Sequence, residues 1–421
     1  MQNPLSSPRP AGAVRSRLRS GSAAATALAL WLVVASCGEY LDVGGVPPAA
    51  PTPAALSADV PVFDIRGDSA ALANMRERFL EDIEVAVTVD VYRDGARVLD
   101  ARGAEVQVKG SGSAYYPLKS LGIKFDEDID NGDGRLLTVP EVLRGHDLGE
   151  LRAVRLRNGG QDFHGTLVKD LAYARLMAGA DLAVVPLYGE PAAAFVNGAF
   201  YGLLNLRTES NANGLSRLLG VRKRDLHLGE VEDHYEFFVK AGDGAPFRAL
   251  AAAVRAEDRE AALALVDEAS FIDFVLAGTI FSTWPWPSRN VRAYAVGDGP
   301  LRFLSFDHDH ASEWWADQGI VEQMRTRPPS LIGDLFELAI ADPGFLQRLE
   351  ARLDALIAGG RLHPRRLRRA FEDLTAAYAP IIAHQTAQYG TPVSEGSWLI
   401  DAERHVRDYE RRWRGLTGDG G

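Results

Sequence analysis

The sequence of 421 residues contains a single cysteine, Cys37, so the chain cannot form an internal disulfide and its stability must come from a packed core. It also lacks an excess of basic charge, because 57 acidic and 46 basic side chains give a net charge of −11. That balance argues against a nucleic-acid partner. With 46% hydrophobic and 24% charged residues, the composition is that of a globular protein with one large or two modest domains.

Several common markers of enzyme chemistry are absent as well. The sequence contains no Walker A motif, no HExxH, no G-x-S-x-G and no C-x-x-C pair, and no internal repeat is visible. Several common reaction classes therefore lack their usual marker, and a site must be sought in other clusters of polar residues.

The only long apolar run lies near the N-terminus, at residues 23–36 ("AAATALALWLVVAS"), and it follows three arginines in 15–19. It is too short to span a bilayer comfortably and is typical of a signal-peptide core. The run ends in "VVASC", which resembles a bacterial lipobox. We therefore expect residues 1–36 to be a lipoprotein signal peptide and Cys37 to anchor the chain by lipid in the cell envelope, at the bacterial outer membrane or cell surface. The alternative is an ordinary signal peptide with Cys37 incidental.

The segment after Cys37 is rich in proline and alanine. Residues 44–55 read "GGVPPAAPTPAA", a composition that favours an extended, semi-rigid chain. We expect residues 37–58 to be a tether and residues 59–415 to form the folded domain.

The first part of this domain predicts β-structure. Residues 59–125 contain stretches in which apolar and polar residues alternate, and 151–163 predicts a strand that ends in a Gly-Gly turn. Residues 164–180 predict a helix with an apolar face. The strongest local pattern is "AAAFVNGAFYGLLNLR" (192–207), where Asn197-Gly198 supplies the two positive-φ positions of a type I′ turn between two strands.

The second part predicts helices from about residue 245, interrupted by an elbow within 279–294 ("TIFSTWPWPSRNVRAY") and by a short strand at 301–310. Proline cannot continue a helix, so the chain must change direction at the elbow. These patterns favour an α+β fold with a β-rich N-terminal lobe at about 59–240 and a helical C-terminal lobe at about 241–415.

An acidic segment at 126–137 ("DEDIDNGDGRLL") resembles a calcium loop, but its spacing fails. Aligning Asp133 and Gly134 with the fifth and sixth positions of an EF-hand loop places Ile129 where the first acidic ligand belongs. We expect an acidic surface turn here, with weak cation binding as the alternative.

Three clusters could carry chemistry. The first is the glycine-rich turn from Lys109 to Ser113, followed by Lys119 and Lys124, which could hold phosphates or could be a hairpin with a solvated edge. The second is the elbow, which ends at Asn290.

The third cluster is the run Asp307-His308-Asp309-His310. On a strand, Asp307 and Asp309 would share one face and the two histidines the other. Paired carboxylates suit a hard cation such as Mg²⁺, whereas His308 and His310 could instead help to bind zinc, and a surface acidic strand end is the plainest alternative.

The order of these parts is that of a protein-kinase-like phosphotransferase, in which an Asn and an Asp on neighbouring loops hold Mg²⁺ against nucleotide phosphates. The motifs "VKGSGSAYYPLKSLGIKF", "LRNGGQDFHGTLVKDLAYARL", "FVNGAFYGLLNLRTE", "WPWPSRNVRAY" and "SFDHDH" occur in sequence over about residues 60–410. Together they resemble the spore coat protein CotH-like kinases, whose members carry "RGNS…yPKKSyrIkF", "LRnggxD", "vNGxyyGlYnLrE", "DWPxNNvrxw" and "WDxD" in the same order.

The resemblance implies a two-lobed atypical protein-kinase-like fold that uses ATP and Mg²⁺, with Mn²⁺ as an alternative, to phosphorylate secreted or cell-surface proteins on serine or threonine. Asp307 matches the metal-binding Asp of "WDxD", and Asn290 matches the second Asn of the elbow. Lys119 matches the second lysine of "PKK", and Lys109 replaces the arginine of "RGNS". The expected metal ligands are Asn290, Asp307 and Asp309, of which the first two would also be catalytic; the expected nucleotide ligands are Lys109, Ser113, Lys119 and Lys124.

Three departures from the family pattern fall at this expected site. Pro285 stands where the family has an Asp, Arg289 replaces the first Asn of the elbow, and Thr208 replaces the Glu of the hairpin's "RE", with Glu209 one place later. They leave three interpretations open: a Mg²⁺-dependent protein kinase, a non-catalytic member that binds nucleotide or a partner protein as a scaffold, and a metal-dependent enzyme of another kind.

Overall fold

The computed structural model describes residues 51–125, 137–138, 143, 150–312 and 318–417. The predicted signal peptide, Cys37, most of the tether and residues 126–136 of the acidic segment lie outside these ranges. None of the helices within the described ranges is both long and apolar enough to cross a membrane.

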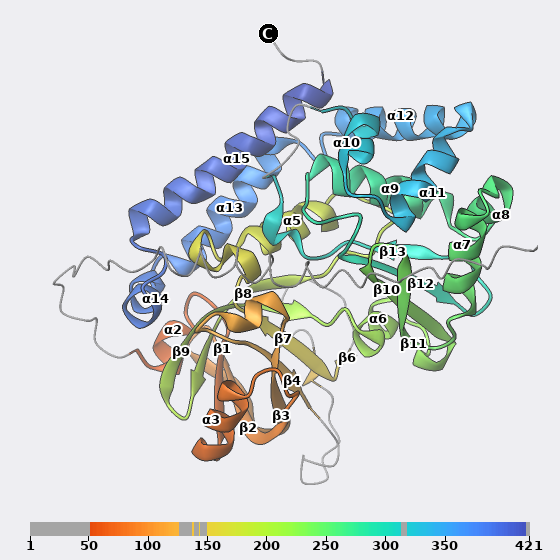
Figure 1. Ribbon diagram of the computed structural model, residues 1–421. Helices are drawn as coiled ribbons and strands as arrows, with labels where there is room; N and C mark the ends of the chain where they lie inside the picture. The colour runs from red at the N-terminus through yellow and green to blue at the C-terminus, as the bar shows by residue number, and fades with distance from the viewer. Residues whose placement is uncertain (1–50, 126–136, 139–142, 144–149, 313–317, 418–421) are drawn as a thin grey trace, which may run out of the picture. The chain divides into compact units, whose positions relative to one another are not determined.

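The N-terminal part contains a closed barrel of seven strands in the order β1-β2-β3-β4-β7-β9-β8 (Figure 1). The strands are β1 (Val62–Gly67), β2 (Val85–Arg93), β3 (Ala96–Lys109), β4 (Ser120–Lys124), β7 (Ala153–Arg157), β8 (Gly189–Val196) and β9 (Ala199–Thr208). A parallel pairing of β1 with β8 closes the barrel, and all other pairings are antiparallel. Closure removes the open edges of the sheet. A closed barrel of seven strands is not a typical kinase lobe.

The predicted hairpin is confirmed at residues 192–207. Val196 pairs with Ala199, and Asn197 and Gly198 between them have φ angles of 49° and 79°. Asn197 also connects the turn to the end of β1, because its amide accepts from the backbone N–H of Gly67 at 2.9 Å and donates to the carbonyl of Gly67 at 3.0 Å. The turn therefore helps to align the two strands that close the barrel.

A second sheet has the order β11-β10-β12-β13. Its strands are β10 (Leu226–Asp233), β11 (Glu236–Ala241), β12 (Val291–Val296) and β13 (Arg302–Leu304). The antiparallel pairing of β10 with β12 crosses the lobe boundary that we expected near residue 240. Residues on both sides of that boundary thus share one sheet. Its strand β12 begins directly after Asn290, the last residue of the elbow. A further pair of short strands, β5 (Leu137–Thr138) and β6 (Glu150–Leu151), forms a two-stranded sheet.

The C-terminal part is helical, as expected. Its helices are α7 (Ala245–Arg255), α8 (Arg259–Ala264), α9 (Glu268–Ile280), α10 (Ile320–Thr326), α11 (Leu331–Ile340), α12 (Pro343–Ala358), α13 (Pro364–Tyr378), α14 (Ile382–Tyr389) and α15 (Glu395–Thr417). Helix α5 (Lys169–Ala178) packs on α13, which in turn packs on α15 (Figure 1). The fold is therefore α+β, with a β-rich N-terminal part and a helical C-terminal part.

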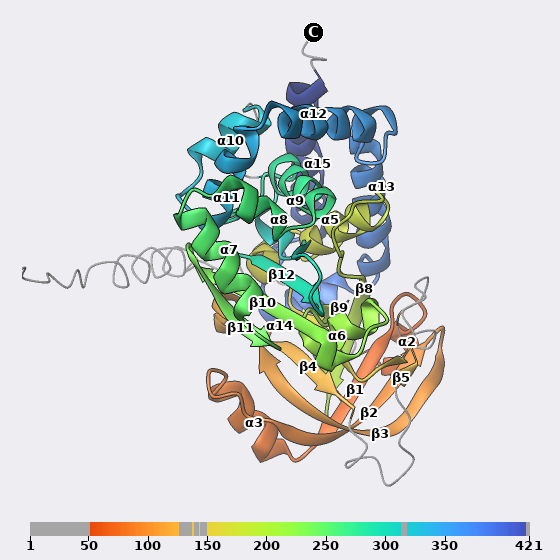
Figure 2. The ribbon, with the colours of Figure 1, turned by 90° about the vertical axis from the view of Figure 1, so that its right-hand side faces the viewer.

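Three local features differ from the expectations. The helix expected at 164–180 begins only at Lys169, because residues 160–164 form a 3₁₀ turn and Leu167 has a φ of 64°. Helix α3 (Ser69–Glu77) lies beside β2 and β3, and Asp68 caps its first turn through a 2.7 Å hydrogen bond (Figure 2). Helix α6 (Ala212–Leu218) follows β9 and packs on β10.

The folded chain begins before residue 59. Residues Pro53–Leu56 form the short helix α2, which Thr52 caps with a hydrogen bond of 3.3 Å. Leu56 is buried, and α2 contacts β1, β2 and β8. The end of the predicted tether is therefore part of the barrel's packing, because one apolar side chain finds a place in the core.

Candidate active site

Residues from both sheets and from α5 line a cavity of about 260 Å³. Its lining contains five cationic and three acidic side chains, an excess of two positive charges. The cations are Lys109, Arg155, Arg157, Arg207 and Arg292, and the acids are Asp170, Glu230 and Asp307. The remaining lining is mostly small and polar: Gly110, Ser111, Ser113, Ser120, Leu187, Thr208, Ser210, Asn290 and Phe306. Two further carboxylates, Glu209 and Asp309, lie behind the lining and pair with Arg155 and Arg157, so the cations at the cavity surface are balanced from behind.

The predicted proximity of Asn290 and Asp307 is confirmed. The amide Nδ2 of Asn290 donates to Oδ2 of Asp307 at 2.8 Å. Both residues adopt left-handed backbone conformations, with φ angles of 57° and 66°, which Asn and Asp tolerate better than most residues.

Buried Arg327 holds the elbow that delivers Asn290. Its guanidinium donates to the carbonyls of Thr283 at 2.5 Å and of Trp286, and it lies 4.9 Å from the centre of the Trp286 ring. The side chain of Trp286 is itself buried against Gly278 of α9. These contacts hold the proline-rich turn against the helical part, and the chain continues from it to Asn290 in the cavity lining.

The strand expected at 301–310 is shorter than we expected. Strand β13 ends at Leu304, and His308–His310 form a 3₁₀ turn that follows the left-handed Asp307. The alternation of faces predicted for a strand therefore does not apply. Asp307 and Asp309 still converge, because the turn brings both carboxylates to one guanidinium.

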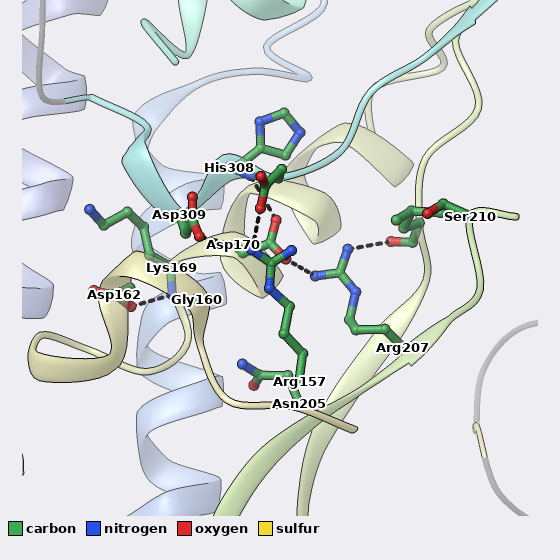
Figure 3. A network of polar contacts seen from close by, with 12 residues as sticks. Arg157, Gly160, Asp162, Lys169, Asp170, Asn205, Arg207, Ser210, His308 and Asp309 are labelled. Carbon is green, nitrogen blue, oxygen red and sulfur yellow. Dashed lines mark hydrogen bonds and ion pairs between the residues drawn. The ribbon is translucent and has the colours of Figure 1, made fainter. Parts of the chain in front are cut away.

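That guanidinium belongs to Arg157, at the end of β7. The same atom, Nη2, donates to Oδ1 of Asp307 and to Oδ2 of Asp309, the latter at 2.8 Å. Figure 3 shows Arg157 close to Asp309 and Asp170. Nη1 lies 3.3 Å from a carboxylate oxygen of Asp170, which also accepts from Arg207 at 2.6 Å. Arg157 thus stands among three carboxylates, and Asp170 links it to Arg207.

These contacts change the protonation of the acids. Although burial raises the pKa of Asp170, the guanidinium groups of Arg207 and Arg157 hold that pKa well below its usual range. Burial, together with the nearby carboxylate of Asp307, raises the pKa of Asp309 to about 7. Asp170 is therefore a permanent anion, whereas Asp309 can take up a proton near neutral pH.

His308 does not carry the zinc chemistry that we considered. Its backbone N–H donates to Asp170 at 2.8 Å, and its buried ring lies within 3.2 Å of the Ser305 hydroxyl and 3.4 Å of the Thr283 hydroxyl. Burial lowers the pKa of His308 to about 4, so the ring is neutral at pH 7. Across the described residues, no group of three or more His, Cys, Asp or Glu side chains is arranged to hold a metal ion.

The three expected metal ligands, Asn290, Asp307 and Asp309, do not fit Mg²⁺ in this arrangement. Both oxygens of Asp307 are engaged, one by Arg157 and the other by Asn290. The oxygen of Asp309 that faces Arg157 also accepts from the backbone N–H of Gln161 at 2.8 Å. A divalent ion beside these carboxylates would also lie close to the cationic guanidinium of Arg157, which would offset part of their attraction.

The expected nucleotide ligands separate into two pairs. Lys109 and Ser113 line the cavity. Lys119 does not: its buried ammonium donates to the carbonyl of Ala114 at 2.6 Å and lies 4.1 Å from the centre of the Phe79 ring. Lys124 is also outside the cavity lining, where it pairs with Glu105 on the neighbouring strand at 2.9 Å.

Strand register, rather than sequence distance from the glycine turn, accounts for the position of Lys124 outside the cavity lining. Lys124 pairs in register with Glu105, whereas Ser120 pairs with Lys109 at the end of the strands that meets the turn. Of the residues of β3 and β4, only Lys109 and Ser120 belong to the lining.

Several site residues were missed in the sequence. Arg155, Arg157 and Arg207 lie on β7 and β9, and Asp170 lies in the first turn of α5. A signal was present, since charged side chains inside strands that also carry buried apolar residues require partners. Glu209, displaced by one place from the family position, pairs with Arg155 at 3.2 Å and is buried.

Comparison with known proteins finds neither a family model nor a curated protein that matches this chain. The resemblance to the CotH-like kinases therefore stays an expectation that depends on the five motifs and on their order.

Proposed function

We infer that this chain is a kinase-like protein of the bacterial cell envelope that binds a nucleotide in the cation-lined cavity and has lost most or all phosphoryl transfer. In this proposal, the barrel together with strands β10, β11 and β12 of the second sheet corresponds to the N-terminal lobe of an atypical kinase. The helices of the C-terminal part correspond to its C-terminal lobe. The role of the protein is then that of a scaffold, which binds a partner protein according to whether nucleotide is present.

One observation carries the proposal. The cavity combines a glycine-rich turn, five cationic side chains and the Asn290–Asp307 pair, whereas Arg157 occupies the space between the two carboxylates that a catalytic metal would need. Nucleotide phosphates are commonly held by oriented N–H donors and cations, and phosphoryl transfer additionally needs a metal and a base. Pro285 supplies no carboxylate and does not belong to the cavity lining.

Nucleotide binding is tested by the thermal unfolding of the purified chain with and without ATP. An increase in melting temperature of a few degrees at millimolar ATP is expected, together with no transfer of radiolabelled γ-phosphate to casein or to the chain itself. An unchanged melting temperature at saturating ATP, with a signal from a known nucleotide-binding protein in the same assay, would refute the proposal.

A second candidate is a weakly active, Mg²⁺-dependent protein kinase that phosphorylates secreted or surface proteins. The contact between Asn290 and Asp307 favours it, because these are the residue types that hold Mg²⁺ in kinase-like sites. Pro285→Asp would restore the family carboxylate, and a general base contributes roughly 10²–10⁴-fold to a rate. A tenfold or larger gain in phosphate transfer over the wild type would support this candidate, and equal, undetectable transfer in both would dismiss it.

A further inference from the structure

We propose that the cavity binds a phosphate-type oxyanion without a divalent cation, and that the guanidinium of Arg157 takes the place between Asp307 and Asp309 that a metal ion would occupy. This inference deepens the proposed function and rests on it only in naming a nucleotide as the ligand. A different phosphate ester or a polyphosphate could occupy the same site.

The position of Arg157 supports the first half of the proposal. A single nitrogen, Nη2, bridges the carboxylates of Asp307 and Asp309, and Nη1 lies 3.3 Å from Asp170. A metal that shares two carboxylates performs the same electrostatic task. With 17% of its side chain exposed, Arg157 is held between the acids and still lines the cavity, so its positive charge is available to a ligand.

Surrounding charges make the site stable without a bound ion. Behind the lining, Asp309 pairs with Arg157, and Glu209 pairs with Arg155 at 3.2 Å. Glu230 pairs with Arg292 at 2.9 Å. Every arginine in the lining thus has a carboxylate partner, so the unliganded protein pays no penalty for an isolated buried charge. The arginines remain fixed, oriented donors at the surface of the cavity.

The glycine-rich turn supplies donors that are not engaged elsewhere. The ammonium of Lys109 and the hydroxyls of Ser111 and Ser113 line the cavity and form no hydrogen bond or ion pair with any other residue in the described ranges. Gly110 between them has a φ of 117°, which disfavours any side chain and lets the backbone turn at the cavity rim. A phosphate group with two negative charges can accept hydrogen bonds from an ammonium, hydroxyls and guanidinium groups at the same time.

The size of the cavity also favours a small anionic group. At about 260 Å³, it lies just below the range of roughly 300–1,000 Å³ that is usual for pockets that enclose drug-sized ligands. The cavity is therefore matched to phosphate groups, with the remainder of a larger ligand, such as a nucleoside, outside it.

The test is isothermal titration of the full chain with pyrophosphate and with ATP, each in EDTA and in excess MgCl₂. We expect binding in EDTA that Mg²⁺ does not strengthen, because Mg²⁺ coordinates the phosphates in solution and lowers their negative charge. Lys109→Gln should weaken binding about tenfold, since a charged hydrogen-bond partner is lost. Lys124→Gln, on the next strand and outside the cavity, is the matched control and should bind as the wild type does.

Arg157→Gln tests the replacement of a metal directly. Removal of the guanidinium should abolish metal-free pyrophosphate binding and create binding of Mn²⁺ alone, measured by the loss of the free-ion electron paramagnetic resonance signal. Because this variant leaves three carboxylates without their shared cation, its folding is checked by circular dichroism; if it is unfolded, the decision falls to Lys109→Gln and the EDTA comparison.

The outcomes separate the two proposals. Pyrophosphate binding in EDTA without ATP binding supports a metal-free oxyanion site and removes the nucleotide from the proposed function. ATP binding that EDTA abolishes and Mg²⁺ restores overturns the metal-free site and leaves nucleotide binding intact. Failure of both ligands to bind under either condition overturns both proposals.

Discussion

Asn290 donates a hydrogen bond of 2.8 Å to Asp307, although the two residues belong to different turns and are 17 positions apart in the sequence. Arg157 engages the other oxygen of the same carboxylate. Each carboxylate oxygen of Asp307 therefore has a partner, and 25% of the side chain is exposed. The neighbours of Asp307, rather than its residue type, decide whether its carboxylate binds a metal ion or pairs with an arginine.

Substitution of Asp307 distinguishes these roles. Asp307→Asn retains an acceptor oxygen and removes one negative charge beside the cavity. If the site binds oxyanions without metal, pyrophosphate affinity in EDTA should rise about threefold to tenfold, because a unit repulsion in a partly solvated site is lost. Isothermal titration measures the change. If the wild type instead binds pyrophosphate only with Mg²⁺, and Asp307→Asn no longer binds it, Asp307 is a metal ligand.

Arg327 should be essential to the elbow. Arg327→Lys keeps the positive charge but cannot reach the carbonyls of Thr283 and Trp286 with the same fork, so buried acceptors lose their donor. We expect a loss of about 2–4 kcal/mol in the free energy of unfolding, measured by urea denaturation. Arg325→Lys, an exposed site that pairs with Glu337, is the control and should change stability by less than about 0.5 kcal/mol. Equal effects of the two substitutions would contradict this role for Arg327.

His308 should make the protein sensitive to mild acid. Because burial lowers its pKa from 6.5 to about 4, the unfolded chain takes up a proton below pH 6.5 that the folded chain does not accept until about pH 4. Its contribution to stability is thus complete above pH 6.5 and is lost progressively down to pH 4. In His308→Gln, the fall in unfolding free energy between pH 7 and pH 5 should be smaller than in the wild type by about 2 kcal/mol. Identical pH profiles of the two proteins would show that the pKa of His308 does not differ between the folded and unfolded states.

Cys37 should anchor the protein to a membrane. Cys37→Ser should release the folded domain into the soluble fraction or leave unprocessed precursor, and Ala49→Ser in the tether is the control that should not. One acyl chain gives only marginal membrane affinity, so stable anchoring requires at least two. Fractionation with mass analysis of the N-terminus measures both. Membrane retention of a processed Cys37→Ser protein would rule out the lipid anchor.

The local turn at Asn197-Gly198 and the helices after residue 245 were predictable because short-range chemistry specifies them. An Asn-Gly pair between apolar strands requires positive φ angles, and a repeated apolar face requires a helix. The same reasoning failed at 305–310, where β13 has already ended at Leu304 and the left-handed Asp307 leads into a 3₁₀ turn. That conformation is stabilised by contacts with Asn290 and Arg157, which are distant in the sequence.

The sequence alone thus supplies only candidates: Lys109, Ser113, Lys119 and Lys124 for phosphate, and Asn290, Asp307 and Asp309 for a metal. Closure of the barrel and the register of β3 with β4 place Lys109 in the cavity and leave Lys124 outside it. The folded chain also inserts Arg157 between two acids that, taken by themselves, would suit Mg²⁺. Charge interactions depend on distances of a few ångströms between residues 150 positions apart, and such distances arise only when the strands and turns have packed.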